Sequence, residues 1–394
     1  KNAENMDAAI KAFKVNVTLH LSGTPYRILM GSEFDKKDII AFCPFTDIAN
    51  EQKKWNDEHI LDDQYREWDN PYFGFPEMIR FAFHPSRSAR MRLEALRKGG
   101  ATYAFSAFFA PESIAPQADG SHRRFKFEKE IRELFQVIDG SKEDDELLGF
   151  LDYDKIKNGM MCRHLVCVLP YCASCDALAA LIARESKKGA FKNLAEYQII
   201  NIAGHDMPPE YANVEEVKKT IRECEQEGKK TLTLTVNRML TGSTVPEWDT
   251  MLYFKDTSSP QEYDQAIFRL QNQFVTEMKT ALPNGREDVI KFNKKPQTIL
   301  VDFDPARLFE MQEEKSKIYN ANEDKAGNTK LKARISAELA VSPIVCVTAG
   351  KIRRVEAEDV MKAVSDYSRN RGVTDEAAKM PVDVAAAAKS KELL

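Results

Sequence analysis

The most restrictive feature of the sequence is an alternation of strand-like and helix-like segments between residues 163 and 302. Apolar or β-favouring runs occupy residues 163–169, 197–202, 231–236, 250–254 and 297–302. Between the first three runs, apolar residues recur at helical spacing over residues 174–186 and about 214–227. Strands that alternate with helices at this spacing predict a parallel sheet with helices packed on its faces.

The segments on either side of this alternation have a different character. Residues 15–22 alternate apolar and polar side chains like a strand, and the turn Gly23-Thr24-Pro25 follows. Residues 36–160 are rich in aromatic residues and in Pro and Gly breaks, with one clear helix near 125–138. After Pro305 the sequence becomes helical and charged. We therefore divide the chain into 1–35, a connecting region 36–160, an α/β unit 161–305 and a mostly helical extension 306–394.

Composition excludes several classes of protein. The 394 residues include 57 basic and 61 acidic side chains, a net charge of −4, so any nucleic-acid contact must come from local patches. No run approaches the roughly 18 apolar residues of a membrane-spanning helix, and the N-terminus lacks a secretory-signal pattern. Seven Cys, an odd number, are typical of reduced thiols in a cytoplasmic protein.

The most specific local signal is a helix start at residue 259. Ser259, Pro260 and Glu262 form a capping box with Pro at the first helical position. At about 100° per residue, a helix over 260–274 places four apolar side chains on one face and three polar ones opposite. The apolar face contains Tyr263, Ile267, Leu270 and Phe274, and the polar face contains Gln265, Arg269 and Asn272.

The polar face has two interpretations. It can be an ordinary solvated helix surface, which is what such a face usually is. Alternatively, it can line a ligand site, because this helix follows strand 250–254 and ligands of parallel sheets bind at the carboxyl ends of strands. The Gly-bearing loop after strand 231–236 must reach the same edge.

Four segments, in order, resemble the motor motifs of superfamily-two helicases. Leu21–Arg27 (LSGTPYR) resembles motif III, and Leu165–Cys172 (LVCVLPYC) resembles motif IV, the first strand of the second RecA-like lobe. Thr235–Pro246 (TVNRMLTGSTVP) resembles motif V, and Gln265–Asn272 (QAIFRLQN) resembles motif VI. The nearest similarity is to the motor of type I restriction enzymes, in which a segment like Val301–Pro305 (VDFDP) follows. The resemblance covers about 15–35 and 160–305.

The chain departs from the family pattern in two places and lacks two motifs. Asn272 stands where motif VI usually has a second Arg, and Thr244 stands where many relatives have Asp in motif V. No phosphate-binding Gly-x4-Gly-Lys-Ser/Thr loop and no acidic box for Mg²⁺ occur. In the family both lie upstream of motif III. The resemblance therefore implies that 1–35 is the end of a first lobe, and that this chain alone is an inactive fragment.

The resemblance also implies roles for individual residues. Arg269 is expected to be the arginine finger that meets the γ-phosphate, and Gln265 to orient or sense the nucleotide. Gly242, Thr244 and Thr241 are expected to contact a phosphate of ATP or of DNA. The coupling of hydrolysis to movement along double-stranded DNA is assigned to Ser22, Gly23, Thr24 and Thr235.

The implied activity is that of an ATP-dependent DNA translocase or helicase of a restriction-modification system. ATP and Mg²⁺ are expected to be held mainly by the first lobe. The expected partners are that lobe, a nuclease region, and methyltransferase and specificity subunits, without a membrane. Two alternatives stay open: a repair or general helicase of the same superfamily, and a non-catalytic RecA-like module that binds nucleic acid or protein.

Other clusters favour structural interpretations. Cys162, Cys167, Cys172 and Cys175 surround the strand 163–169, and buried thiols are favoured over a zinc site because no second Cys/His pair has suitable spacing. No metal ligand is therefore assigned. His20 and His205 are interpreted as core or loop residues. The basic stretches at 87–98 and 123–127 can touch DNA phosphates, but solvated surfaces are favoured.

Overall fold

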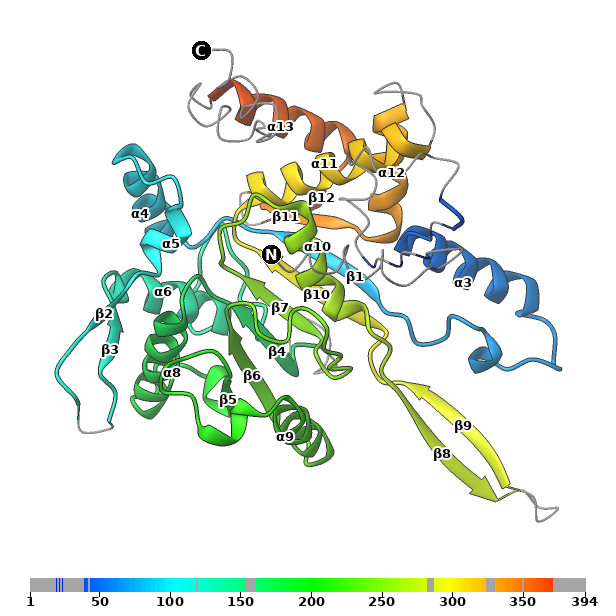
Figure 1. Ribbon diagram of the computed structural model, residues 1–394, viewed down its shortest axis with the longest axis horizontal. Coiled ribbons are helices and arrows are strands. Elements are labelled where there is room, and N and C mark those ends of the chain that lie inside the picture. The colour runs from blue at the N-terminus through cyan, green and yellow to red at the C-terminus, as the bar shows by residue number, and fades with distance from the viewer. Residues whose placement is uncertain are drawn as a thin grey trace, which may run out of the picture.

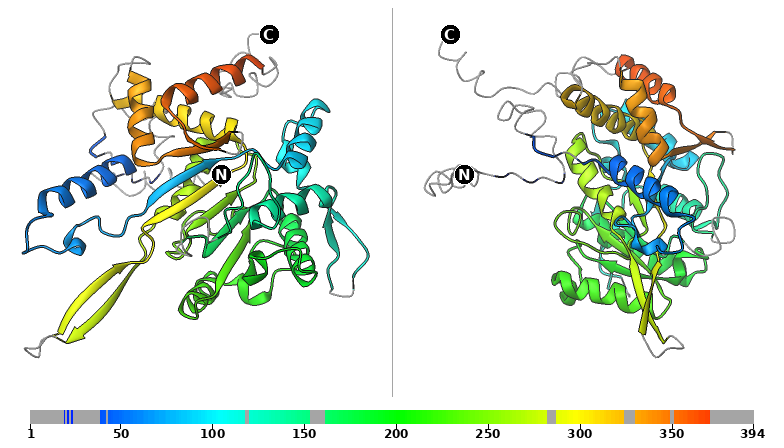
Figure 2. Two further views of the ribbon diagram at one scale, coloured as in Figure 1. Left: turned by 180° about the vertical axis from the view of Figure 1, so that it is seen from behind. Right: turned by 90° about the vertical axis from the view of Figure 1, so that its right-hand side faces the viewer.

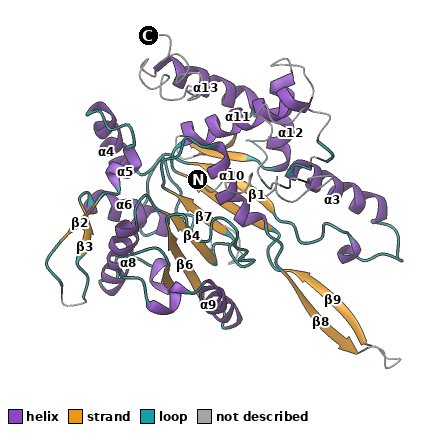
Figure 3. Cartoon of the chain, in the orientation of Figure 1, coloured by secondary structure: helices purple, strands orange, loops and turns teal. Residues whose placement is uncertain are grey.

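The chain folds around one eight-stranded sheet with helices on both faces (Figure 1, Figure 3). This computed structural model describes residues 19, 21, 23, 39–41, 43–117, 120–152, 161–281, 287–323, 330–348 and 351–370. The predicted α/β class with a parallel central sheet is confirmed. Within the described ranges, none of the helices has the length and apolar character needed to cross a membrane.

The sheet is parallel except at one edge. Its strand order is β12-β11-β1-β10-β7-β4-β6-β5, and only β12 runs antiparallel to its neighbour. The bounds are β1 Glu77–Ala82, β4 His164–Val168, β5 Tyr197–Asn201, β6 Lys230–Thr235, β7 Thr250–Tyr253, β10 Gln297–Asp302, β11 Ile344–Thr348 and β12 Lys351–Arg354.

Two hydrophobic clusters cover the two faces of the sheet. In β4, Leu165 and Cys167 belong to one cluster, whereas Val166 and Val168 belong to the other. This division follows from the alternation of side chains along a strand, and it explains why β4 reads as a continuous apolar run. The first face carries α4 Arg87–Lys98, α5 Ala104–Phe108, α6 Glu128–Asp139 and α8 Cys172–Lys187.

The second face carries the helices that follow the other strands. They are α9 Val214–Gln226, α10 Pro260–Ile267, α11 Pro305–Glu323, α12 Leu331–Val341 and α13 Ala357–Asn370. A further helix, α3 (Phe45–His59), packs beside α12. Short 3-10 turns occur at η2 Glu67–Asp69, η3 Leu194–Glu196, η4 Pro209–Ala212 and η5 Phe268–Gln271.

Two antiparallel ribbons lie outside the main sheet. The first pairs β2 (Pro111–Ser113) with β3 (Arg123–Phe125). The second pairs β8 (Val275–Ala281) with β9 (Glu287–Asn293) and projects away from the body of the molecule (Figure 1, Figure 2). This second ribbon is inserted between α10 and β10, so its two roots lie next to the segment that resembles motif VI and to the start of a central strand.

The strands predicted between 163 and 302 are confirmed as β4, β5, β6, β7 and β10. The sequence did not predict that β1, β11 and β12 complete the sheet. In β1 the apolar pattern is interrupted by Arg80, which is nevertheless buried. Its guanidinium donates to Gln312 Oε1 at 2.5 Å and to the carbonyl of Ser342 at 2.5 Å. A charge with internal acceptors can thus occupy a central strand without a visible sequence signal.

Several predicted features fall outside the described residues. The strand expected at 15–22, His20, Ser22 and Thr24 are among them, and of the motif III segment only Leu21 and Gly23 are described, both exposed. The sheet takes β1 from the region 36–160 and β11 and β12 from the region 306–394.

Candidate functional site

The site begins where α10 leaves the carboxyl end of β7. The Ser259 hydroxyl accepts a hydrogen bond from the Glu262 amide at 3.2 Å, as the capping box predicts. The return bond from Glu262 is replaced: the Ser259 amide donates to Thr257 Oγ1 at 3.2 Å, and the Glu262 carboxylate pairs with Lys255. The helix start is therefore fixed by a side-chain network that includes the loop after β7.

The helix itself is shorter than predicted. Tyr263, Ile267 and Leu270 are buried against the sheet as expected. The α-helix ends at Ile267, a 3-10 turn continues to Gln271, and Asn272 is extended with ψ 140°. The prediction of one helix over 260–274 is thus wrong at its end, because the chain turns there into strand β8. Asn272 bonds the carbonyl of Arg269 at 3.0 Å and so ends the turn instead of joining a helical face.

Arg269 lies in the 3-10 turn that follows this helix, and its side chain reaches the loop after β6. Its Nη1 donates to the carbonyl of Ser243 at 2.8 Å, and its Nε lies 3.3 Å from the carbonyl of Gln265. No ion pair of Arg269 is found in the described part of the chain. Burial lowers the pKa of its guanidinium below the usual range, although Arg stays charged at neutral pH. The contact joins the two segments that resemble motifs V and VI.

The loop over residues 236–249 has an unusual backbone. Met239 has φ 64° and Gly242 has φ 71°, both in the left-handed region. Glycine adopts this conformation without penalty, whereas for Met239 it is strained. The buried Thr235 hydroxyl donates to the carbonyl of Arg238 at 2.8 Å and closes the turn.

Three predicted contact residues of this loop face solvent. Thr241, Gly242 and Thr244 are exposed, and a side chain at Gly242 has open space around it. Hydroxyl groups and backbone amides at such an exposed turn can bind the oxygen atoms of a phosphate. Thr235 differs from them, since its hydroxyl is used inside the protein.

Arg238 joins this loop to the one after β5. Its guanidinium donates to the carbonyl of Ile202 at 2.9 Å and to that of Ala212. His205 lies exposed in the same neighbouring loop, where its backbone amide donates to the buried carboxylate of Asp176 at 2.8 Å. The loop interpretation of His205 is confirmed.

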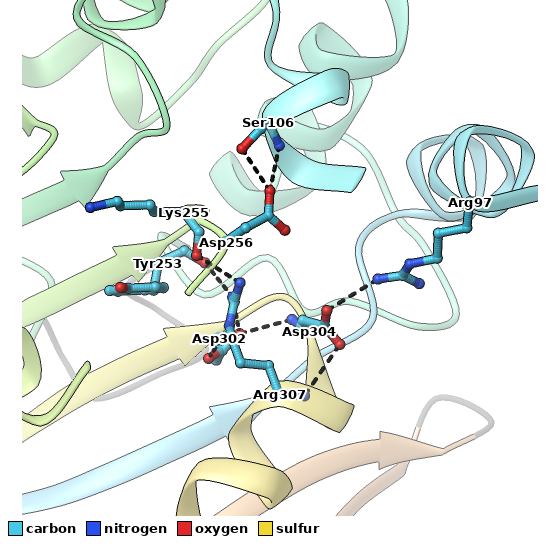
Figure 4. A network of polar contacts seen from close by, with 8 residues as sticks. All are labelled: Arg97, Ser106, Tyr253, Lys255, Asp256, Asp302, Asp304 and Arg307. Carbon is cyan, nitrogen blue, oxygen red and sulfur yellow. Dashed lines mark hydrogen bonds and ion pairs between the residues drawn. The ribbon is translucent and has the colours of Figure 1, made fainter. Parts of the chain in front are cut away.

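A second polar cluster at the carboxyl ends of β7 and β10 was not predicted as a site (Figure 4). Buried Asp302 accepts from Arg307 Nη2 at 2.5 Å and from Arg307 Nε at 3.2 Å, and from the Tyr263 hydroxyl at 2.8 Å. Burial opposes the charge of Arg307, but Asp302 and Asp304 raise its pKa above the usual range. Arg307 also donates to the carbonyl of Lys255 at 2.8 Å. The cluster therefore ties α10, α11 and two strand ends together.

The outer part of this cluster reaches α4 and α5. Ser106 donates from its amide and its hydroxyl to Asp256 at 2.7 and 2.8 Å, and Arg97 pairs with Asp304 at 3.1 Å. Figure 4 shows these groups around the ends of the strands. Every charge named here has a partner inside the protein, so the cluster has the character of a structural clamp. The sequence signal that could have found it is Val301–Pro305, where acidic residues end an apolar strand.

The remaining candidates have structural surroundings. Cys162, Cys167 and Cys175 are buried and Cys172 is half-buried. Burial raises the pKa of the Cys167 and Cys175 thiols, which keeps them protonated and unreactive. Across the described ranges, no group of three or more His, Cys, Asp or Glu could hold a metal ion.

The basic stretches are largely engaged within the protein. On α4, Arg90 pairs with Glu146 and Arg92 with Glu130, both at 2.6 Å. In the β2–β3 ribbon, Arg124 pairs with Glu112 at 2.5 Å. These guanidinium groups are therefore already neutralised by carboxylates, which agrees with the surface interpretation.

Comparison with known proteins gives one informative result. No family model matches the chain. A protein of Mycoplasma pneumoniae named "Putative type II restriction enzyme and methyltransferase RM.MpnORF110P C-terminus" is 28% identical over 307 residues. The chain is thus similar to a protein whose name places it in a restriction system. The match covers 75% of this chain but only 38% of that relative, so the chain spans well under half of the relative's length.

Proposed function

We propose that this chain is the second RecA-like lobe, with its flanking parts, of an ATP-dependent DNA translocase or helicase in a restriction-modification system. The observation that carries the proposal is the contact between Arg269 and the carbonyl of Ser243. It joins the two segments that resemble motifs V and VI, which are separated in the sequence by β7 and most of α10. The similarity to a restriction-system protein supports the same setting.

The chemistry of the contact fits a phosphate ligand. Arg269 carries a charge that no described carboxylate neutralises, and the neighbouring loop presents Thr241, Gly242 and Thr244 to solvent. A planar guanidinium suits phosphate oxygens, and hydroxyl and amide groups add hydrogen bonds. In this proposal Arg269 stabilises charge on the γ-phosphate, and Gln265, whose carbonyl faces the Arg269 side chain, helps to orient the nucleotide.

The other functions of the proposed enzyme are assigned to other residues and regions. ATP and Mg²⁺ are held mainly by a first lobe, whose phosphate loop and acidic residues are not found in this sequence. Thr241 and Thr244 are assigned to a phosphate of ATP or duplex DNA. Ser22, Gly23 and Thr24 couple the lobes, and Thr235 shapes the loop. The nuclease region and the methyltransferase and specificity subunits are the proposed partners.

The decisive experiment measures ATP hydrolysis by the full-length protein with and without duplex DNA. Arg269→Ala is expected to lower DNA-stimulated turnover about 10³-fold or more, because an arginine finger acts mainly on the transition state. Arg222→Ala, which removes an exposed guanidinium of α9, is the matched control and is expected to leave turnover unchanged.

The outcome separates the alternatives. Normal turnover in Arg269→Ala contradicts the finger assignment, and a lack of any DNA-stimulated ATP hydrolysis in the wild-type protein favours a non-catalytic module. Displacement of a triplex-forming strand from duplex DNA reports translocation. If translocation and cleavage respond to methylation of the DNA target, the protein acts in restriction, and indifference to methylation favours a repair or general helicase.

A further inference from the structure

Two cations at the roots of the β8–β9 ribbon hold the same loop. Arg269 precedes the ribbon and Lys295 follows it, and the root is closed by a hydrogen bond from the Lys294 amide to the carbonyl of Phe274 at 2.8 Å. Arg269 donates to the carbonyl of Ser243. Lys295 donates to the carbonyls of Pro246 at 2.7 Å and Trp248 at 3.0 Å. The loop 236–249 is thus attached to the ribbon root at both of its sides.

The environment of Lys295 disfavours the positive charge of its side chain. The residue is 2% exposed, and in the described ranges its ammonium makes no ion pair, although the carboxylates of Asp249 and Glu247 face it. Burial lowers its pKa to about 8, and the two carboxylates oppose this shift only in part. An ammonium removed from water and bonded to two carbonyls costs free energy that a buried apolar side chain would not. Its hydrogen bonds to the loop are what the chain gains from it.

The carbonyls that Lys295 binds belong to the anchored end of the loop. Trp248 is fully buried, with its indole nitrogen 3.3 Å from Thr233 Oγ1, and the Asp249 carboxylate accepts from the amide of Arg163 at 2.8 Å. The opposite end holds the strained Met239. A strained backbone persists only where its surroundings determine it at several points. The two hydrogen bonds from Lys295 determine the backbone in this way, in the part of the loop that follows Ser243.

We propose that Lys295 is a positioning residue that fixes the 245–249 end of the loop and thereby holds the Ser243 carbonyl against Arg269. The ribbon root then sets the position of the loop through two cations, one on each side. The effect on catalysis rests on the function proposed above, whereas the effect on the loop does not.

The loop can be tested by hydrogen exchange of its backbone amides. Lys295→Met keeps the length of the side chain and removes the ammonium, and Lys294→Met removes an exposed neighbouring charge as the matched control. Lys295→Met is expected to speed exchange over 236–249 about tenfold or more by local opening, with β5 and α9 unchanged. Lys294→Met is expected to leave the loop as in the wild type. Equal loop protection in Lys295→Met and wild type overturns the proposal.

A pH profile distinguishes positioning from a general loss of stability. Opening of the loop takes both carbonyls from the ammonium while Lys295 stays buried, so opening lowers the pKa of Lys295 further below its value of about 8. Corrected for intrinsic exchange, loop protection in the wild type is therefore expected to fall as the pH rises towards about 8 and to level off above it. Asp249 and Glu247 face the group, and His164 lies near Asp249, so the comparison is made against Lys295→Met, which is expected to be flat. A parallel fall in both proteins overturns the proposal.

Turnover of the full-length protein separates this proposal from the previous one. Lys295→Met is expected to lower kcat for DNA-stimulated ATP hydrolysis more than it changes KM for ATP, because the loop determines the orientation of the Arg269 guanidinium. If Arg269→Ala leaves turnover intact, the proposed function fails, and loop exchange alone still decides the role of Lys295. A folded Lys295→Met protein with a loosened loop but normal kcat contradicts the catalytic part.

Discussion

The two ends of strand β10 each carry a buried cation, and the two are held in opposite ways. Lys295 precedes the strand and bonds only to carbonyl groups of a loop. Arg307 follows the strand and is paired through two nitrogens with the buried carboxylate of Asp302. Burial lowers the pKa of Lys295 to about 8, whereas Asp302 raises the pKa of Arg307.

The cluster at the carboxyl end of β10 is therefore a structural clamp, whereas the contact at its amino end can change with the protonation of Lys295. At the carboxyl end, the charges neutralise one another and join α10, α11 and two strands, so any movement breaks several bonds at once. At the amino end, Lys295 makes no ion pair within the described ranges, so the cation can lose its proton near physiological pH without breaking one. The second arrangement is the one next to the loop that we propose for phosphate contact.

The largest expected effect tests the clamp. Arg307→Met leaves the Asp302 carboxylate buried without its partner, and we expect the free energy of unfolding to fall by about 3–5 kcal/mol. Urea unfolding of the chain measures the change.

The matched control is the double variant Asp302→Asn with Arg307→Met. It removes both charges and is expected to be more stable than Arg307→Met alone. A double variant that is less stable than the single one would show that the pairing is not what makes Arg307 important.

The pH dependence of stability tests the other end of the strand. Below pH 8 Lys295 is protonated in both folded and unfolded chains, and the cost of burying the charge is fully present. Between about pH 8 and the usual value of 10.5, only the unfolded chain keeps the proton, so this residue makes stability rise with pH across that window. The rise corresponds to about 3 kcal/mol.

The measurement is urea unfolding at pH 7.5 and pH 10 for the wild type, Lys295→Met and Lys294→Met. Other groups titrate in the same window, but the wild type and Lys295→Met share all of them. The difference in stability between wild type and Lys295→Met is therefore the quantity of interest. If that difference is the same at both pH values, Lys295 does not titrate as a buried ammonium.

The sequence predicted one part of this comparison far better than the other. The strands β4, β5, β6, β7 and β10 were found because they are apolar or β-favouring runs, a pattern set by burial on both faces. The start of α10 was found because Ser259 and Glu262 have a fixed spacing. Both signals are local in the chain.

The features that were missed depend on distant partners. Arg80 is compatible with strand β1 only because Gln312 and Ser342, more than 200 residues away, accept hydrogen bonds from its guanidinium. The end of α10 depends on the ribbon that follows it. The clamp on Asp302 and the loop contacts of Lys295 likewise arise only when separate segments meet, so a local pattern does not reveal them.

The smallest expected effect concerns helix α10, which lies between the clamp and the loop 236–249. Helix α10 starts near the clamp, to which it contributes Tyr263, and leads to Arg269 at the loop. Ser259→Ala removes the hydroxyl that caps its first turn, and we expect a loss of about 1 kcal/mol in urea unfolding. The control is Ser258→Ala, an exposed neighbour, for which no measurable loss is expected.

Because the helix is also held by Tyr263 and by Arg269, the loss should be spread over the whole chain and leave exchange in loop 236–249 unchanged. A Ser259→Ala protein in which that loop alone becomes mobile would mean that the helix start, and not the ribbon root, determines the position of the loop.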